Sequence, residues 1–162
     1  MKDLGSSTQF LLDVDAALGV ALSEPDGGDL LAEASRHLVF APDAKRMRPL
    51  FVRETGRVLG ADRDALVHLA TSAELVHAAS LLHDDVVDAG TLRRGRPTVN
   101  VLHGNPAAVL SGDWLLTVAL ARLASLPREV ADRALEVVAR MSRAAMLEVR
   151  ARGTLGGGLA TW

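Results

Sequence analysis

Residues 74–98 read Glu-Leu-Val-His-Ala-Ala-Ser-Leu-Leu-His-Asp-Asp-Val-Val-Asp-Ala-Gly-Thr-Leu-Arg-Arg-Gly-Arg-Pro-Thr. Three aspartates end an otherwise uncharged run: Asp84, Asp85 and Asp88. Three arginines then follow within four positions: Arg93, Arg94 and Arg96. Mg²⁺ prefers oxygen ligands and often binds through one or two carboxylates plus substrate phosphates, whereas arginine recognises phosphate by bidentate hydrogen bonds. On a helix end and the loop that leaves it, these residues together predict a metal-bridged diphosphate site.

Length and composition limit the classes of protein to which this chain can belong. Its 162 residues are about one domain's length, and 49% of them are hydrophobic, which excludes a wholly disordered chain. A net charge of −2, with 18 basic and 20 acidic residues, gives no support to a nucleic-acid binder. The absence of cysteine excludes disulfides and thiolate metal sites. Without an apolar signal region or a run of ~18 to 20 apolar residues, we expect a cytoplasmic protein with no transmembrane segment.

Alanine and leucine dominate the chain and aromatic residues make up only 3%, which favours helices over strands. Apolar spacing and breaker residues predict one all-α domain over residues 1–162, a bundle of about six helices. The expected helices are 7–23, 29–38, one that begins near Pro49, 65–88, 106–125 with an interruption at 111–113, and 128–150. Asp43 and either Asp62 or Asp64 are the expected helix caps. The segments 24–28 and 153–162 are predicted to be a turn and a loop or frayed end.

A second basic segment, Lys45-Arg-Met-Arg48, precedes Pro49. Proline is tolerated only near a helix start, so these cations should lie in a loop or a first turn. Cations there oppose the helix dipole, so the segment is either a solvated basic turn or part of an anion site. On the long central helix, His77, Asp84 and Asp88 should share one face, where two carboxylates one turn apart can grip the same cation cluster.

These segments in order strongly resemble the trans-isoprenyl (polyprenyl) diphosphate synthase family. The resemblance covers about residues 30–152 and rests on four segments: the aspartate motif with its Arg-Arg-Gly-Arg-Pro-Thr continuation, Lys45-Arg-x-Arg48-Pro49, Glu74-x-x-His77, and Leu110-Ser-Gly-Asp-Trp-Leu-Leu116. It implies a helical bundle of the isoprenoid synthase type. It also implies a Mg²⁺-dependent prenyltransferase that condenses an allylic diphosphate with isopentenyl diphosphate, usually as a homodimer.

The resemblance also implies roles for particular residues. Asp84 and Asp88 would coordinate Mg²⁺, with Asp85 supporting the site, and Arg93 would contact the allylic diphosphate. The residues expected to hold the diphosphate of isopentenyl diphosphate are Lys45, Arg48, His77 and Arg94. Ala79 and Ser80, just before the first aspartate, help to floor the product tunnel in this family. Small residues at these two positions resemble those of synthases that make geranylgeranyl or longer diphosphates.

The chain lacks parts of the family pattern. The family is about twice as long and carries a second aspartate-rich motif, which this sequence lacks. Residues 143–152 also differ from the family's usual Gly-Glu-x-x-x-Gln pattern. We therefore expect a truncated, N-terminal part of a synthase with no efficient turnover alone and with some apolar helix faces left uncovered. A non-catalytic binding or regulatory subunit that acts beside a complete synthase is the alternative, and a His-Asp metal phosphohydrolase, prompted by His83-Asp84, is a third.

Three further features are expected to be structural. His83 could orient a neighbouring carboxylate, but we favour its interpretation as a packed histidine. Acidic and basic residues alternate between positions 128 and 140, which predicts a solvated, ion-paired helix face and no second metal site. The opposite face of that helix should turn inward: Val130, Ala134, Val137, Val138, Met141, Ala145 and Val149.

Overall fold

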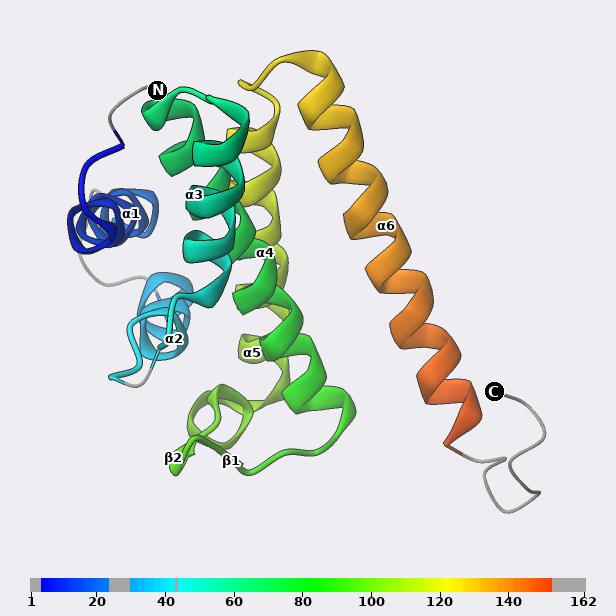
Figure 1. The fold of residues 1–162 in the computed structure, drawn as a ribbon. Helices are drawn as coiled ribbons and strands as arrows, with labels where there is room; N and C mark the ends of the chain where they lie inside the picture. The colour runs from blue at the N-terminus through cyan, green and yellow to red at the C-terminus, as the bar shows by residue number, and fades with distance from the viewer. Residues whose placement is uncertain (1–3, 24–29, 43, 153–162) are drawn as a thin grey trace. The chain divides into compact units, whose positions relative to one another are not determined.

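The computed structural model describes residues 4–23, 30–42 and 44–152, which form six helices and one short hairpin (Figure 1). The elements in order are α1 (Ser7–Ala21), α2 (Leu30–Val39), α3 (Met47–Leu59), α4 (Arg63–Val87), β1 (Leu92–Arg93), β2 (Arg96–Pro97), α5 (Val99–Leu123) and α6 (Arg128–Ala151). The prediction of an all-α protein is confirmed. The predicted turn at 24–28, the Asp43 cap and the terminal loop lie outside the described residues.

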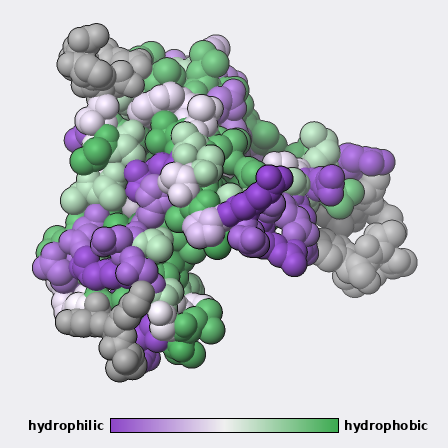
Figure 2. All heavy atoms as spheres, turned by 90° about the horizontal axis from the view of Figure 1, so that it is seen from above, coloured by the Kyte–Doolittle hydropathy of each residue, from purple (hydrophilic) through white to green (hydrophobic). Residues whose placement is uncertain are grey.

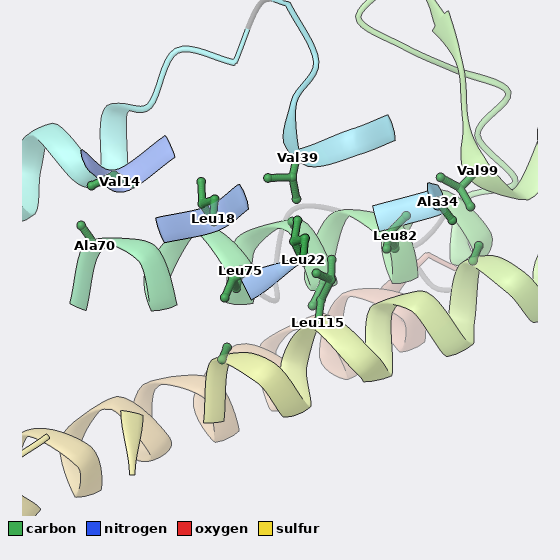
Figure 3. Close-up of a cluster of buried hydrophobic side chains, with 14 of the residues drawn as sticks. Val14, Leu18, Leu22, Ala34, Val39, Ala70, Leu75, Leu82, Val99 and Leu115 are labelled. Carbon is green, nitrogen blue, oxygen red and sulfur yellow. The ribbon is translucent and has the colours of Figure 1, made fainter. Parts of the chain in front are cut away.

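The chain divides into two compact units, residues 1–125 and 126–162. In the first unit, α4 packs against α1, α2, α3 and α5. Fully buried aliphatic side chains from four of these helices meet around it, among them Leu18, Leu75, Leu82 and Leu115 (Figure 3). The apolar sequence of the central helix thus forms the middle of this core, as its composition predicts.

Local chemistry accounts for several helix boundaries. Asp62 caps α4, because its carboxylate accepts hydrogen bonds from the backbone amides of Asp64 and Ala65 at 3.1 and 3.4 Å. Pro49 is the third residue of α3, so its missing amide falls in the first turn, where helix amides have no partner in the helix. The predicted start of this helix near Pro49 is confirmed.

The prediction for α5 missed its first part and was wrong at 111–113. The chain is already helical from Val99, and this part meets the rest at a kink where Gly104 has φ 84° and ψ 161°, two residues before the predicted start at Pro106. The predicted interruption at 111–113 is absent, because Gly112 lies within continuous helix. A Cβ atom on Gly112 would lie 2.4 Å from Nε2 of His83, so this glycine permits close packing of α5 on α4. Glycine as a breaker signal therefore misleads where the glycine permits close helix contact and does not form a turn.

The hairpin between α4 and α5 was not predicted. Leu92 pairs with Pro97 and Arg93 with Arg96 in an antiparallel register. The two residues between them, Arg94 and Gly95, have φ values of 52° and 74°, as tight two-residue hairpin turns require. An arginine at the first of these positions is an unusual turn residue, so the sequence carries only the Gly95 signal.

Apolar side chains remain at the surface of the first unit, as expected for the central helices. Val87 of α4 and Leu110 of α5 are exposed, as are Phe51 and Leu59 of α3. Figure 2 shows hydrophobic and hydrophilic surface interleaved on the face that it displays. Both α4 and α5 are long and apolar enough to cross a membrane, a property that core helices share, and 50% and 39% of their most apolar segments are buried within the protein.

The second unit consists, in its described part, of α6. The ion-paired face is confirmed, with Arg128 3.5 Å from Asp132 and Arg133 2.7 Å from Glu136. Within this unit four of the residues expected to face inward are between 38% and 54% exposed, so that expectation stays a prediction: Val130, Val137, Met141 and Val149. An amphipathic pattern marks a face that can pack, but only a partner element can bury it. The expectation of one domain over 1–162 stays a prediction.

Candidate functional site

The first unit contains a pocket of about 170 Å³, referred to below as the basic pocket. Three segments form it: the end of α2 with the loop to α3 and the first residues of α3, one side of α4, and the hairpin with the start of α5. Six of the described lining residues are cationic: Lys45, Arg46, Arg48, Arg93, Arg94 and Arg96. Two are acidic, Glu74 and Asp85. The pocket therefore carries an excess of positive charge, which suits an anion of several negative charges.

The four residues expected to hold one diphosphate all line this pocket: Lys45, Arg48, His77 and Arg94. They come from positions up to 49 residues apart in the sequence, so only the fold brings them together. Their cationic groups approach from the α2–α3 loop, from α3 and from the hairpin, while the imidazole comes from α4.

Only one of the three aspartates faces the basic pocket. Asp85 lines it together with Glu74, Ala78 and Leu81, which follow one another on α4 at spacings of three and four residues. Asp84 and Asp88 are exposed and lie outside the lining. His77 therefore lines the pocket without the two aspartates that were expected to share its helix face.

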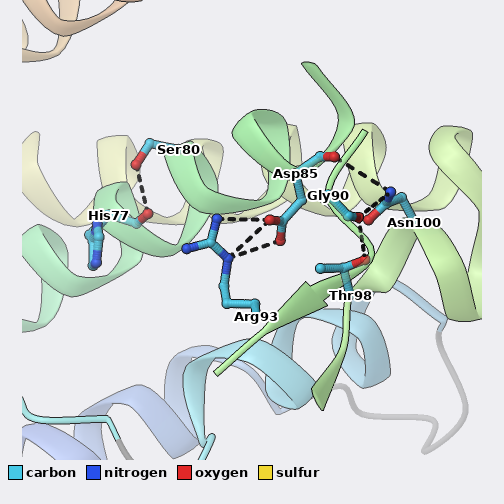
Figure 4. Close-up of polar contacts among 7 residues, drawn as sticks. All are labelled: His77, Ser80, Asp85, Gly90, Arg93, Thr98 and Asn100. Atoms are coloured by element: carbon cyan, nitrogen blue, oxygen red, sulfur yellow. Dashed lines mark hydrogen bonds and ion pairs between the residues drawn. The ribbon is translucent and has the colours of Figure 1, made fainter. Parts of the chain in front are cut away.

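Asp85 and Arg93 form a bidentate ion pair (Figure 4). The Nε atom of Arg93 donates to both carboxylate oxygens at 3.0 Å, and Nη2 donates to Oδ1 at 2.7 Å. The Asp85 side chain is only 7% exposed, against 28% for Arg93. Hydrogen bonding to Asp85, partly opposed by burial, raises the pKa of the Arg93 guanidinium. This pair was not foreseen, because the sequence does not show that the loop folds back along the helix.

Hydrogen bonds also fasten the loop between α4 and the hairpin (Figure 4). The Gly90 amide donates to the Asp85 carbonyl at 2.8 Å. The Gly90 carbonyl in turn accepts from the Thr98 hydroxyl at 2.8 Å and from the Asn100 amide at 3.0 Å. The loop that carries the arginines is therefore held at both ends by α4 and by the start of α5.

The imidazole of His77 lies among the cations of the pocket. Burial, followed by the positive charges of Arg48, Arg94 and Arg93, lowers its pKa from 6.5 to about 4. At neutral pH His77 is therefore uncharged, and it can accept or donate a single hydrogen bond at each ring nitrogen. A bound anion would offset the surrounding positive charge and raise this pKa again.

Two further contacts of pocket residues escaped sequence reasoning. Arg46 bridges Asp15 and Glu74 and so connects the α3 start with α1 and α4. Arg96 donates to the backbone carbonyl and to Nδ1 of His37, at 3.2 and 3.0 Å, while Nε2 of His37 donates to the Pro97 carbonyl at 2.9 Å. No sequence signal identifies these partners, because they lie 28 to 60 residues apart.

The two residues expected to influence product chain length differ in burial. Ala79 is buried in the hydrophobic core, whereas Ser80 is half-buried and donates its hydroxyl to the His77 carbonyl at 2.8 Å. Small side chains at these positions are consistent with close packing of α4. Their effect on a product tunnel stays a prediction.

The residues expected to bind Mg²⁺ are Asp84 and Asp88. Both carboxylates are exposed on the last turns of α4, while Asp85 is engaged by Arg93. No group of three or more histidine, aspartate or glutamate side chains in the described part of the chain could hold a metal ion. Two carboxylates still fit Mg²⁺, which commonly takes its remaining ligands from water and from substrate phosphate oxygens.

Two histidines of α4, His68 and His83, contact α5. Nε2 of His83 lies 3.2 Å from Asp113 Oδ1 and 3.3 Å from the Val109 carbonyl oxygen, and His68 Nε2 lies 2.7 Å from the Arg122 carbonyl oxygen. The interpretation of His83 as a packed histidine is therefore supported. Because the described residues contain no histidine–aspartate metal cluster, nothing favours the phosphohydrolase alternative.

Comparison with solved structures identifies the class of fold. An isoprenoid synthase family member from Thermotoga neapolitana superposes with a TM-score of 0.81 at 27% identity, covering 88% of this chain and 56% of that one. Geranylgeranyl pyrophosphate synthetase from Pyrococcus horikoshii Ot3 gives a TM-score of 0.72 at 34% identity, covering 83% and 41%. The fold is that of the all-α isoprenoid synthases.

Sequence comparison then identifies the family. Residues 29–154 match the polyprenyl synthetase family, to which this chain belongs. Octaprenyl diphosphate synthase from Escherichia coli is 36% identical over 129 residues, which cover 76% of this chain and 40% of the relative. Heptaprenyl diphosphate synthase component 2 from Geobacillus stearothermophilus is 45% identical over 96 residues, 59% of this chain and 30% of the relative. The chain thus spans less than half the length of these curated relatives.

Proposed function

We propose that this chain supplies the isopentenyl diphosphate site and half of the Mg²⁺-binding carboxylates of a prenyl diphosphate synthase. The observation that carries this proposal is the convergence of Lys45, Arg48, His77 and Arg94 on one basic pocket. Arg48 comes from α3, Arg94 from the hairpin and His77 from α4, and nothing in helix packing alone requires these side chains to meet. Membership of the polyprenyl synthetase family supports the same function.

The proposed reaction joins an allylic diphosphate to isopentenyl diphosphate. The allylic C–O bond breaks with its electron pair leaving on the diphosphate, the double bond of isopentenyl diphosphate attacks the allylic carbon, and loss of a proton completes the new double bond. When bound, Mg²⁺ neutralises the charge that develops on the leaving diphosphate. Asp84 and Asp88 would hold the metal, and Arg93 would contact the same diphosphate if its pair with Asp85 opened or was shared.

The pocket residues have a separate task in this scheme. Lys45, Arg48 and Arg94 would neutralise the diphosphate of isopentenyl diphosphate, which does not leave in the reaction. A neutral His77 would donate one hydrogen bond to it. Fixing that anion would orient the nucleophilic double bond toward the allylic carbon, and such positioning lowers the activation free energy.

The test uses the catalytically competent enzyme, assayed with an allylic diphosphate, isopentenyl diphosphate and Mg²⁺. Replacing either exposed aspartate, Asp84→Ala or Asp88→Ala, should remove most turnover. The matched control is Asp132→Ala on the ion-paired face of α6, which should retain it. Full activity in Asp84→Ala would refute the assignment. The 162-residue chain alone should bind isopentenyl diphosphate without efficient turnover, and robust turnover would mean that another subunit contributes carboxylates.

We further propose, from the small side chains of Ala79 and Ser80, a geranylgeranyl or longer product. Replacing Ala79 with phenylalanine in the competent enzyme should shorten the product, which chromatography of the dephosphorylated prenyl alcohols would reveal. An unchanged product length would show that other residues close the tunnel.

A second candidate function is that of a binding or regulatory subunit. The observation that favours it is the similarity to a protein described as component 2 of a heptaprenyl diphosphate synthase, since that description implies a multi-component enzyme. Such a subunit would be inactive alone and would restore activity or alter product length with a complete synthase. A homodimer is the other arrangement that we expect, and sedimentation of the purified chain tests whether it self-associates.

A further inference from the structure

The backbone of Arg46 adopts a conformation that is uncommon for residues other than glycine. Its φ and ψ are 48° and 35°, in the left-handed region, and it directly precedes α3. Such a conformation persists in a non-glycine residue where the surrounding structure enforces it. Arg46 is also only 9% exposed, and charged residues are rarely so buried unless they are paired.

Two carboxylates from different helices hold the Arg46 side chain. Nε donates to Oδ1 of Asp15 on α1 at 2.8 Å, and Nη1 donates to Oε2 of Glu74 on α4 at 3.2 Å. The guanidinium carbon also lies 5.9 Å from the centre of the Phe40 ring. Arg46 therefore ties the loop before α3 to two other elements at once.

We propose that Arg46 is a positioning residue for the basic pocket, with two effects on a bound diphosphate. Its two ion pairs fix the backbone between Lys45 and Arg48, and its charge cancels that of Glu74. The inference rests on the proposed function of the pocket as a diphosphate site. It assigns no contact between Arg46 and the reacting atoms.

The first effect follows from the position of Arg46 in the chain. Lys45 is its neighbour and Arg48 lies two residues further on, so the conformation at Arg46 sets where both cations begin. Asp15 contributes to this arrangement although it does not line the pocket. Preorganised cations bind an anion more tightly than cations that must first be ordered.

The second effect follows from the place of Glu74. This carboxylate is buried and lines the same pocket as the cations. Without Arg46, a buried negative charge would face the bound anion, and like charges in a partly desolvated site repel strongly. The guanidinium therefore makes a cationic pocket compatible with a glutamate in its wall.

The experiment titrates inorganic diphosphate into the 162-residue chain without metal, by isothermal titration calorimetry. Arg46→Gly is the principal variant, because glycine adopts the left-handed conformation without strain while both ion pairs are lost. Its affinity should fall at least about tenfold. The matched control is Arg53→Met, which removes an equally buried arginine that donates to the Gly5 carbonyl at 2.5 Å and does not line the pocket. It should keep wild-type affinity.

Asp15→Asn tests the inference by the direction in which the diphosphate affinity changes, because the positioning role and simple electrostatics predict opposite changes. The Asp15 side chain is 43% exposed, so this variant should fold even if Arg46→Gly does not. Removing a negative charge near a cationic site would by itself strengthen anion binding. Loss of the Arg46 anchor instead predicts binding about twofold to fivefold weaker. Unchanged or tighter binding would overturn the inference.

A double variant tests the charge cancellation. Glu74→Gln added to Arg46→Gly should recover part of the lost affinity, an effect that a purely structural role for Arg46 would not produce. No recovery would overturn this half of the inference.

Arg48→Ala separates failure of the inference from failure of the proposed function. If the wild-type chain does not bind diphosphate, or if Arg48→Ala binds equally well, the proposed function itself fails. If Arg48→Ala loses binding while Arg46→Gly and Asp15→Asn keep it, the pocket is a diphosphate site and only the positioning role of Arg46 is refuted.

Discussion

Replacing Asp85 with asparagine should lower the free energy of unfolding by about 2 kcal/mol. The Asp85 carboxylate accepts three hydrogen bonds from Arg93, at 3.0, 3.0 and 2.7 Å. A hydrogen bond to a charged group contributes about 1.5–3 kcal/mol, and such contributions from one pair do not add. Asparagine retains one acceptor oxygen but turns an NH₂ group toward the guanidinium. Because the Arg93 side chain is 28% exposed, water replaces part of what is lost.

Urea unfolding followed by circular dichroism measures this change. With a slope of ~2 kcal/mol/M, the midpoint should fall by about 1 M at an unchanged slope. The matched control is Asp84→Asn, the same chemical change at the adjacent but exposed position, which should stay within about 0.5 kcal/mol of wild type in the absence of metal. Equal effects of the two substitutions would refute the ion pair as the contact that holds the arginine hairpin to α4.

Three further predictions concern stability. Because the pKa of His77 is lowered to about 4 in the folded chain, the unfolded chain binds more protons between that value and 6.5. Stability should therefore fall as the pH drops through this range, and His77→Gln should reduce the pH dependence in urea titrations at pH 7 and pH 5. Leu75→Ala, at a fully buried core position, should cost about 2–5 kcal/mol in urea unfolding, whereas Leu59→Ala, at an exposed position, should change stability by less than about 0.5 kcal/mol. Gly19→Ala, where an added Cβ meets nothing within 4 Å, should stabilise α1 by up to about 1 kcal/mol, but Gly56→Ala, whose Cβ would lie 2.3 Å from a leucine of α4, should not raise the melting temperature.

The helical class and the central place of α4 could be predicted from sequence, because they rest on local signals. The Asp62 cap and the first-turn position of Pro49 are such signals, and each depends on a few neighbouring residues. Gly112 shows the limit of this reasoning. Its break signal was overridden by helix contact with His83, a residue 29 positions away that no local pattern reveals.

The candidate site likewise has features that could be predicted from the sequence and contacts that could not. The resemblance to the family was enough to predict four residues that line the basic pocket: Lys45, Arg48, His77 and Arg94. The pairing of Asp85 with Arg93 was not predictable, because it depends on a loop that folds back on α4. The Arg46 bridge was not predictable either, since its partners lie on helices distant in sequence.

The most direct test of the central claim is an NMR titration of the His77 imidazole with isopentenyl diphosphate. If the basic pocket binds the diphosphate, the ring resonances of His77 should shift on binding and its pKa should rise from about 4, because the anion offsets the charges of Arg48 and Arg94. The same titration of Arg48→Ala should require a much higher ligand concentration. Binding that leaves the His77 resonances and pKa unchanged would contradict the account.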